Sequence, residues 1–201
     1  MRIIIGRHGD SVGTKGKFHG PINHPLTSKG REEAYKLARD VKKYHPSIIY
    51  YSPLDRCRDT AKIVASELGI PTKPAKELGP LDVGDYDGKP IDKYLPRVRY
   101  HLMHTDVPFP NGGTVDEWAG KYLPFLERKL EDKKNETIMF LSHGRNIVLT
   151  KAYIKAGGLA PEFDKETVYD NKVSTEHGGH AIVSPNHFEI VTPRPVKVGE
   201  S

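Results

Sequence analysis

The chain has 201 residues, of which 36% are hydrophobic and 28% charged, and a formal net charge of +5. This length and composition predict one soluble domain over residues 1–193, followed by a flexible tail at 194–201. No apolar stretch is long enough for a membrane span, and a single cysteine, Cys57, excludes an internal disulfide and favours a cytoplasmic location. The basic residues are scattered, which favours a small acidic substrate over nucleic acid.

The first predicted element is a strand at residues 3–6, whose sequence is Ile-Ile-Ile-Gly. A short aliphatic run of this kind is typical of a buried strand in a mostly parallel sheet. Arg7 and His8 follow it directly, and open α/β sheets bind ligands just past the carboxyl ends of their strands. The sequence therefore puts an anion-binding guanidinium beside a potential nucleophile, where a phosphate ester could be held and attacked.

A helix is predicted next, with Thr27 as its N-cap. Its apolar positions recur at the helical period, at Ala34, Leu37, Ala38 and Val41. The helix should end before the pair His45-Pro46, because a residue that precedes proline is disfavoured in the helical region.

The segment 48–51 predicts a second buried strand, and the residues after it predict a second helix. Ser52 is expected to cap this helix, with Pro53 at its first position and Asp55 at its third. Gly69 is expected to close it.

The remaining chain continues the alternation of strands and helices. A loop with a short strand is predicted at 73–90, and helices at 91–104 and 115–130. A third buried strand at 137–141 runs into Ser142-His143-Gly144 and then a helix at 145–156. A terminal hairpin is predicted from 181–183 and 188–191, turning at Pro185-Asn186.

Three of these strands deliver charged or nucleophilic groups at the same kind of position. The first presents Arg7 and His8, the second leads to Arg56, and the third ends at His143. Parallel strands of one sheet share their carboxyl edge, so the four groups are expected to converge. Arg56 in the first turn of its helix would add charge to a terminus that already favours anions. Two guanidiniums and two imidazoles around one point predict a phosphoryl-binding pocket.

Four motifs carry a family resemblance: Arg7-His8-Gly9, residues 23–30 (NHPLTSKG), residues 52–61 (SPLDRCRDTA) and Ser142-His143-Gly144. In their order and chemistry they resemble the histidine phosphatase superfamily, which has the phosphoglycerate-mutase-like fold. The motifs span roughly the first three quarters of the chain. The resemblance implies a three-layer α/β sandwich, with a mostly parallel central sheet flanked by helices.

The resemblance also implies a mechanism. His8 attacks the phosphorus and forms a phosphohistidine that water hydrolyses, while Arg7, Arg56 and a protonated His143 hold the phosphoryl oxygens. No metal or other cofactor is implied.

Further substrate contacts are implied at three positions of the resemblance. Ser11 and Thr14 would add hydroxyl contacts, and Gly144 would contact the substrate from the third strand's end. Thr14 stands where many relatives have an asparagine.

The sequence departs from the family pattern at Pro80. Relatives commonly carry there a glutamate that protonates the leaving oxygen, and proline cannot donate a proton. Asp82 is the nearest replacement, and an ordinary solvated loop aspartate is an equal reading of it. Loss of a general acid costs about two to four powers of ten in rate, mostly for poor leaving groups.

The leading hypothesis is a metal-independent histidine acid-type phosphatase, a phosphoric monoester hydrolase that acts on a small phosphorylated molecule or a phosphoprotein. One alternative is a phosphoglycerate-type mutase, although the segment 92–113 is short for the insertion that mutases usually carry. The other is a catalytically weak phosphate-binding protein that lacks the usual acid. A homodimer is compatible with the resemblance.

Several other polar and aromatic residues are predicted to have structural roles. The histidines outside the motifs form no regular metal-ligand spacing, and surface or pocket-lining positions are expected for them: His19, His24, His177 and His180. Trp118 and Tyr122 are expected to pack in the core, as is Cys57.

Overall fold

The computed structural model describes residues 1–13, 15–132, 135–156, 176–185 and 187–191. The described residues form five α-helices: α1 (Ser28–Val41), α2 (Asp55–Leu68), α3 (Ile91–Met103), α4 (Val115–Glu131) and α5 (Gly144–Lys155). They also form six strands: β1 (Arg2–Arg7), β2 (Ile49–Tyr51), β3 (Thr72–Pro74), β4 (Thr137–Ser142), β5 (His180–Ser184) and β6 (His187–Val191). Short 3₁₀ turns lie at Lys42–Tyr44, Lys76–Leu78 and Gly84–Tyr86.

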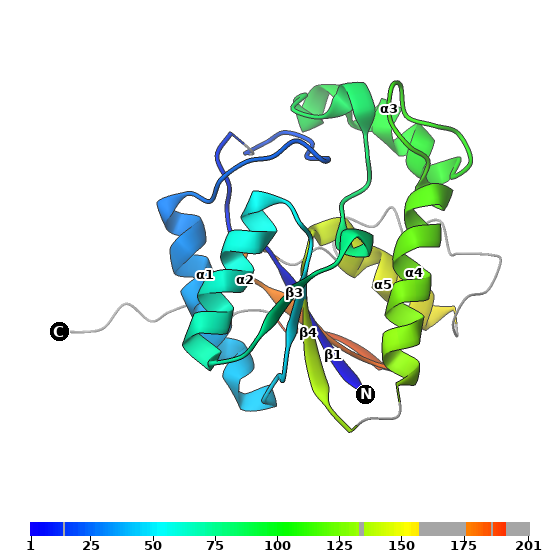
Figure 1. The fold of residues 1–201 in the computed structure, drawn as a ribbon. Helices are drawn as coiled ribbons and strands as arrows, with labels where there is room; N and C mark the ends of the chain where they lie inside the picture. Colours follow the sequence, from blue (N-terminus) through cyan, green and yellow to red (C-terminus); the bar gives the residue numbers. More distant parts are fainter. Residues whose placement is uncertain (14, 133–134, 157–175, 186, 192–201) are drawn as a thin grey trace.

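The strands form one mixed sheet in the order β3-β2-β4-β1-β5-β6 (Figure 1). β3, β2, β4 and β1 run parallel, and β5 and β6 complete the sheet as an antiparallel hairpin. This confirms the predicted mostly parallel α/β sheet and its terminal hairpin. The predicted turn residue Asn186 and the predicted tail at 194–201 lie outside the described residues.

Alternation of side chains along the strands builds two cores, one on each face of the sheet. Ile4 and Met139 pack with α1 and α2, whereas Ile3 and Phe140 pack with α4 and α5. Figure 1 shows these helix pairs on opposite sides of the sheet. The buried strands therefore have both faces covered, as their continuous aliphatic sequences predict. Trp118 and Tyr122 lie in the second core, as expected.

The start of α2 differs from the prediction. The helix begins at Asp55, its N-cap residue is Leu54, and no side chain of that residue caps it. The backbone N–H of Asp55 instead donates to Oδ1 of Asn23, at 2.7 Å, from a loop 32 residues earlier. Ser52 therefore does not cap the helix, because its hydroxyl is used by His143, as described below. The Thr27 cap of α1 is confirmed, since its side chain accepts from the N–H of Gly30.

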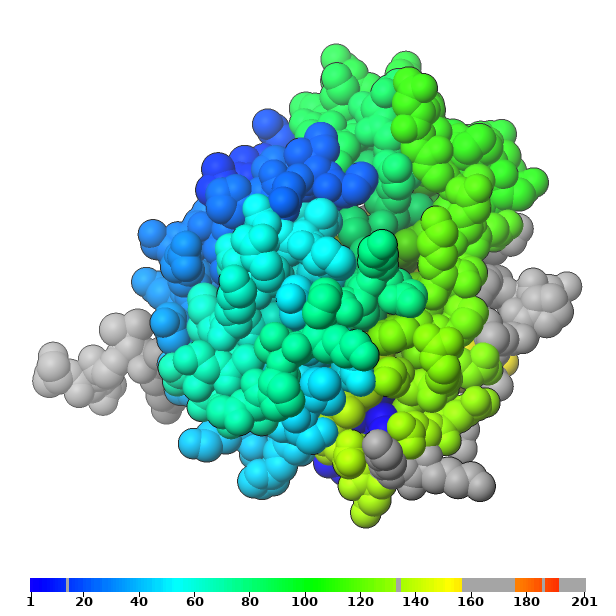
Figure 2. Space-filling model, in the orientation of Figure 1, coloured from blue at the N-terminus to red at the C-terminus, as the bar shows by residue number. Residues whose placement is uncertain are grey.

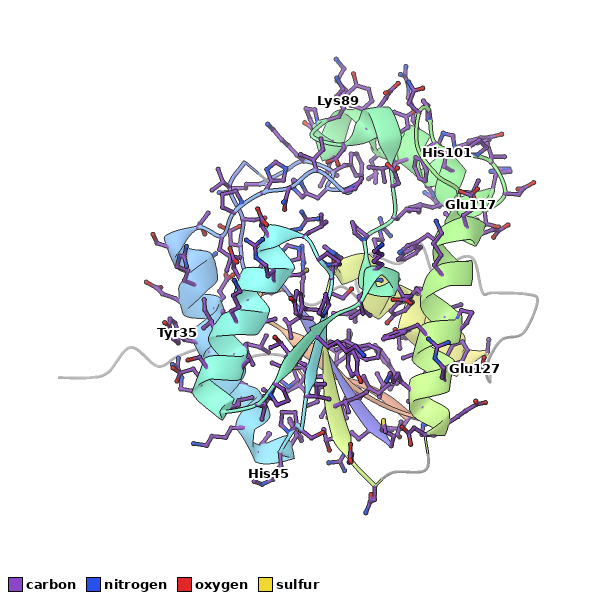
Figure 3. All side chains as sticks on the ribbon, in the orientation of Figure 1. Tyr35, His45, Lys89, His101, Glu117 and Glu127 are labelled. Carbon is purple, nitrogen blue, oxygen red and sulfur yellow. The ribbon has the colours of Figure 1, made fainter. Side chains whose placement is uncertain are left out.

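The loop after β1 and helix α3 lie together beyond the carboxyl edge of the sheet. Phe18 donates its N–H to the carbonyl of Lys89, and Ile91 donates to the carbonyl of Gly16. In Figure 2 the blue surface of this loop adjoins the green surface around α3. Lys89 and His101 mark the two ends of the α3 segment in Figure 3. No helix within the described residues is long and apolar enough to span a bilayer.

Close backbone packing fixes the loop after β1 against α1. A Cβ on Gly30 would overlap the carbonyl oxygen of Asp10, and a Cβ on Gly9 would overlap that of Gly30. We expect Gly30→Ala to lower the free energy of unfolding by about 1–3 kcal/mol, because the backbone segments at Asp10 and Gly30 would have to move apart to make room for the methyl group. Gly120→Ala is the matched control: it lies inside α4 with open space around its Cβ position. It should raise stability by up to about 1 kcal/mol. Urea unfolding measures both, and equal stability of the two variants would contradict the packing argument.

His180 is buried at the start of β5, opposite Gly6 of β1, and not at the surface or in the pocket as expected. Neither of its ring nitrogens has a hydrogen-bond partner among the described residues. Burial lowers its pKa to about 4, while Asp40 raises the pKa and Lys43 lowers it.

This burial makes the fold sensitive to acid. The unfolded chain takes up a proton at His180 below pH 6.5, whereas the folded chain does not until about pH 4. The contribution of neutral His180 to the free energy of unfolding is therefore fully present above pH 6.5 and is lost as the pH falls toward 4. We expect the loss of unfolding free energy between pH 7.5 and 5 to be smaller in His180→Leu than in the unsubstituted protein, by about 2 kcal/mol. Urea titrations at the two pH values measure this difference, and an identical loss in both proteins would refute it.

Candidate active site

Two histidines meet where β1 and β4 end. The register pairs Arg7 with Ser142, so the next residue of each strand, His8 and His143, lies at the same carboxyl edge. Their ring centroids are 5.2 Å apart, and both side chains are buried. The predicted convergence of the first and third strands is therefore present in the structure.

The hydrogen bond of His8 fixes which of its ring nitrogens carries the proton. Nδ1 lies 2.8 Å from the carbonyl oxygen of Gly9, and a carbonyl can only accept, so Nδ1 carries the proton. Nε2 then keeps its lone pair. Burial lowers the pKa of His8 well below 6.5, and the nearby His143, Arg56 and Arg7 lower it further. His8 is therefore neutral near pH 7, with a free lone pair on Nε2.

The contacts of His143 differ from the protonated state that the sequence led us to expect. Its Nδ1 lies 3.4 Å from Nη2 of Arg56, and a guanidinium can only donate, so Nδ1 accepts. Its Nε2 then donates to Oγ of Ser52 at 3.0 Å. Burial lowers the pKa of His143 well below 6.5, and Arg56 and Arg7 contribute in the same direction. His143 is therefore neutral in this arrangement.

Cys57 lies directly behind this pair. Its Sγ is 3.6 Å from Nε2 of His143 and 3.6 Å from the carbonyl oxygen of Ser142. Burial raises the pKa of its thiol to about 12, so it stays protonated. Cys57 packs in the core, as expected.

Arg56 is almost fully buried in the first turn of α2, with 1% of its surface exposed. It donates to the carbonyl oxygens of Ile22 and Gly20 at 2.9 and 2.8 Å. Its guanidinium thus holds the loop after β1 in place and sets the charge around His143. Burial lowers its pKa, and Asp87 acts against that effect.

Arg7 is held by a third histidine, which the sequence reading did not assign to the site. Its Nη2 donates to Nε2 of His177 at 3.0 Å, and Nδ1 of His177 faces Oδ1 of Asp10 at 3.7 Å. The His177 and His8 ring centroids are 5.4 Å apart. Burial lowers the pKa of Arg7 to about 10 and that of His177 to about 4, so His177 remains a neutral acceptor.

The position of His177 follows from the antiparallel pairing of β5 with β1. Because β5 runs opposite to β1, the residues that precede it lie at the carboxyl end of β1. Arg7 donates its N–H to the carbonyl of Gly179, and Gly178 donates to that of His8. The sequence shows a histidine just before the terminal hairpin. Only the direction of β5 relative to β1 places that histidine next to Arg7.

Replacing His177 by alanine should weaken the binding of inorganic phosphate roughly tenfold, because Arg7 loses the acceptor that orients its guanidinium. The dissociation constant of vanadate, an analogue of phosphate, should rise in parallel. His177→Gln keeps an acceptor near the same place and should restore part of both losses. His187→Ala, at an exposed position of β6, is the control. An unchanged vanadate constant in His177→Ala would contradict this positioning role.

A cavity of about 330 Å³ opens over the two histidines. Arg7, His8, His143 and Gly144 line it, and the substrate contact predicted for Gly144 stays a prediction. The structure does not bring Asp82 to this cavity: its side chain is exposed and accepts from the N–H of Gly84 at 3.0 Å. The neighbouring Pro80 and Leu81 line the cavity instead.

Of the two residues predicted to add hydroxyl contacts, the structure describes only Ser11. Ser11 is buried and pairs with Leu26, and it is not among the described residues that line the cavity. Thr14 lies outside the described residues. His19 lines the cavity, and its ring lies against His24 with centroids 5.9 Å apart. Within the part of the chain that the structure describes, no three His, Cys, Asp or Glu side chains gather as metal ligands would.

The fold and this site together define an α/β protein with an anion pocket built around a neutral histidine. The chain belongs to the histidine phosphatase superfamily (branch 1), whose family model matches residues 3–186.

Known proteins of two kinds resemble the chain. It is 26% identical over 156 residues to a protein named uncharacterized phosphatase PhoE from Bacillus subtilis, covering 77% of this chain and 78% of that protein. It is 28% identical over 158 residues to a 2,3-bisphosphoglycerate-dependent phosphoglycerate mutase from Parvibaculum lavamentivorans, covering 72% and 75%. Among solved structures, a putative alpha-ribazole-5'-P phosphatase from Escherichia coli superposes with a TM-score of 0.75 at 19% identity. That superposition covers 100% of this chain and 99% of the other, and it establishes the likeness of fold.

Proposed function

We propose that this protein is a metal-independent phosphatase that hydrolyses phosphate monoesters through a phosphohistidine on His8. The observation that carries the proposal is the neutral His8, with its Nε2 lone pair free, beside Arg7 and His143 in the cavity. A neutral imidazole is the form that attacks phosphorus, and the surrounding cations are the groups that hold phosphoryl oxygens.

Binding would precede any proton transfer. Arg7 presents a guanidinium to the cavity beside His8, and the start of α5 at Gly144 adds a helix N-terminus to the same cavity. The negative charge of a bound phosphate dianion offsets the positive charges around His143, and it therefore raises the pKa of that histidine. Protonation of His143 would therefore accompany substrate binding: Nδ1 would take the proton and give up its 3.4 Å contact with Arg56, and the ring would become a third positive group around the phosphoryl oxygens.

The chemical step then uses His8 twice. The Nε2–P bond forms while the bond from phosphorus to the leaving oxygen breaks, and the leaving oxygen takes the electron pair. Water next attacks the phosphohistidine, the P–N bond breaks, and inorganic phosphate leaves while Nε2 recovers its lone pair. Burial keeps His8 neutral in mild acid, and the nearby Arg56 and Arg7 lower its pKa further. This supports an acid-type phosphatase, active below the ordinary histidine pKa of about 6.5.

A partition experiment tests the covalent step. Several phosphate esters with different leaving groups are hydrolysed in water that contains ethanol, and both ethyl phosphate and inorganic phosphate are measured. A common phosphohistidine requires the same ratio of the two products for every ester. A ratio that changes with the leaving group would show that water attacks the ester directly.

Two further measurements separate the alternatives. A phosphoglycerate-type mutase would convert 3-phosphoglycerate to 2-phosphoglycerate in the presence of 2,3-bisphosphoglycerate faster than it releases phosphate. A phosphate-binding protein without turnover would bind vanadate but release no phosphate from any ester.

A further inference from the structure

The cavity beyond the two histidines is lined mainly by apolar side chains. Four of them form a single stripe along α3, at Ile91, Leu95, Val98 and Leu102. Their spacing of four, three and four residues puts them on one face of the helix. Val98 and Leu102 are buried, and Ile91 at the helix start is 36% exposed. The stripe therefore runs from the interior to the mouth of the cavity.

Side chains from three other segments complete this lining. Phe18 comes from the loop after β1, Leu81 and Val83 from the loop before α3, and Val148 from α5. All four are buried, with at most 9% of their surface exposed. We call the α3 stripe and these four residues the apolar wall. Because it is built from four separate segments around one space, it encloses whatever group the phosphate carries.

Polar side chains also line the cavity. Arg7 and the two neutral histidines, His8 and His143, form its phosphoryl end, and the other polar lining residues are Lys17, His19 and Arg145. A volume of about 330 Å³ is at the lower end of the range of small-molecule sites. The leaving group is therefore small and is surrounded largely by hydrocarbon. Sugar or glycerol hydroxyls placed against the apolar wall would lose hydrogen bonds to water without replacement.

The missing acid also restricts the substrate. Pro80, which stands where the family resemblance implies an acid, lines the cavity, and the exposed Asp82 carboxylate accepts from the N–H of Gly84. Proline donates no proton, so an ester whose leaving oxygen departs unprotonated has the advantage here. Phenolates depart far more readily than alkoxides, because their conjugate acids are much stronger.

From these two observations we infer that the substrate is an apolar aryl phosphate monoester. The apolar wall favours a leaving group made largely of hydrocarbon. The lack of a proton donor at Pro80 favours a leaving group whose oxygen is phenolic. The inference depends on the proposed function and adds a substrate class to it.

A panel of four phosphate compounds separates the two selections. 1-Naphthyl phosphate is apolar with a good leaving group, and cyclohexylmethyl phosphate is apolar with a poor one. Acetyl phosphate is small and polar with a good leaving group, and glycerol 3-phosphate is polar with a poor one. We expect kcat/KM for the naphthyl ester to exceed that for acetyl phosphate roughly tenfold. It should exceed that for the cyclohexylmethyl ester by about 100-fold or more. Faster turnover of glycerol 3-phosphate than of the naphthyl ester would overturn the inference.

A pair of variants on α3 tests the apolar wall itself. Leu95→Gln puts a polar group into the stripe, and we expect it to lower the ratio of kcat/KM for naphthyl phosphate over acetyl phosphate roughly tenfold. Tyr100→Gln introduces the same residue at an exposed position of the same helix, and Tyr100 does not line the cavity. The control should leave the ratio unchanged.

The possible failures are distinguishable. An unchanged ratio in Leu95→Gln, with acetyl phosphate still hydrolysed, would overturn the substrate class and leave the phosphatase assignment standing. Failure to hydrolyse acetyl phosphate and the naphthyl ester alike would overturn the phosphatase assignment itself.

Discussion

Replacing His8 by asparagine is expected to abolish phosphate release while leaving the fold intact. Asparagine can keep the hydrogen bond that Nδ1 of His8 makes to the carbonyl of Gly9, but it offers no nucleophile in place of Nε2. We expect kcat to fall by about 10⁴-fold or more, the size of effect seen when the nucleophile of a hydrolase is removed. Phosphate release from an aryl phosphate measures this loss.

A second measurement makes the His8 result specific. Brief reaction with ³²P-labelled substrate followed by alkaline denaturation should trap acid-labile label on the unsubstituted protein and none on His8→Asn. His45→Asn is the control: His45 adopts φ 50°, a left-handed conformation that asparagine tolerates, at the opposite end of the molecule from α3 (Figure 3). Its turnover should match that of the unsubstituted protein. If the label stays on His8→Asn, then another residue is the nucleophile.

Replacing Arg7 by alanine is expected to lower kcat/KM by about 10²- to 10³-fold, the usual cost of removing a group that stabilises transition-state charge. Arg7 lines the cavity and is oriented by His177 at 3.0 Å, so its guanidinium is positioned before any phosphate arrives. The loss should appear in kcat/KM and in the vanadate inhibition constant together.

The conservative variant Arg7→Lys separates charge from shape. Lysine keeps the positive charge but not the planar fork of donors that matches phosphoryl oxygens, so it should recover only part of the lost activity. Removal of Arg7 also removes one of the charges that lower the pKa of His8. The acidic limb of the pH profile of kcat/KM should therefore move toward neutral pH in Arg7→Ala. Activity within threefold of normal would show that Arg7 does not hold the phosphoryl group.

Much of the fold could be predicted because its signals are local. The aliphatic runs of β1 and β4 require burial on both faces, and the Thr27 cap and the period of α1 require a helix. The start of α2 was predicted two residues early for an equally physical reason. Ser52 has the residue type and position of a cap, but a tertiary partner, His143, takes its hydroxyl. A local preference worth about 1 kcal/mol is easily overridden by a buried hydrogen bond.

The candidate site likewise contains some residues that local sequence patterns predict and others that they do not. Arg7, His8 and His143 could be predicted because parallel strands share an edge, and the pairing of Arg7 with Ser142 is that edge. Arg56 was expected to hold phosphate oxygens, and the structure shows it bound to the carbonyls of Gly20 and Ile22. His177 could not be assigned, because its approach to Arg7 depends on a strand direction that the sequence does not specify.

By itself, the sequence determined the order of strands and helices along the chain, the edge of the sheet at which Arg7, His8 and His143 meet, and the histidine that we propose as the nucleophile. These features follow from short-range patterns, since the period of apolar residues and the residue after each strand are read directly from the chain. Only the tertiary structure decided the protonated nitrogen of His8, the acceptor for Arg7, the exposure of Asp82 and the apolar wall. Each of these depends on atoms brought together from segments far apart in the sequence. Their energies are those of burial and hydrogen bonding across the fold, which no local pattern encodes.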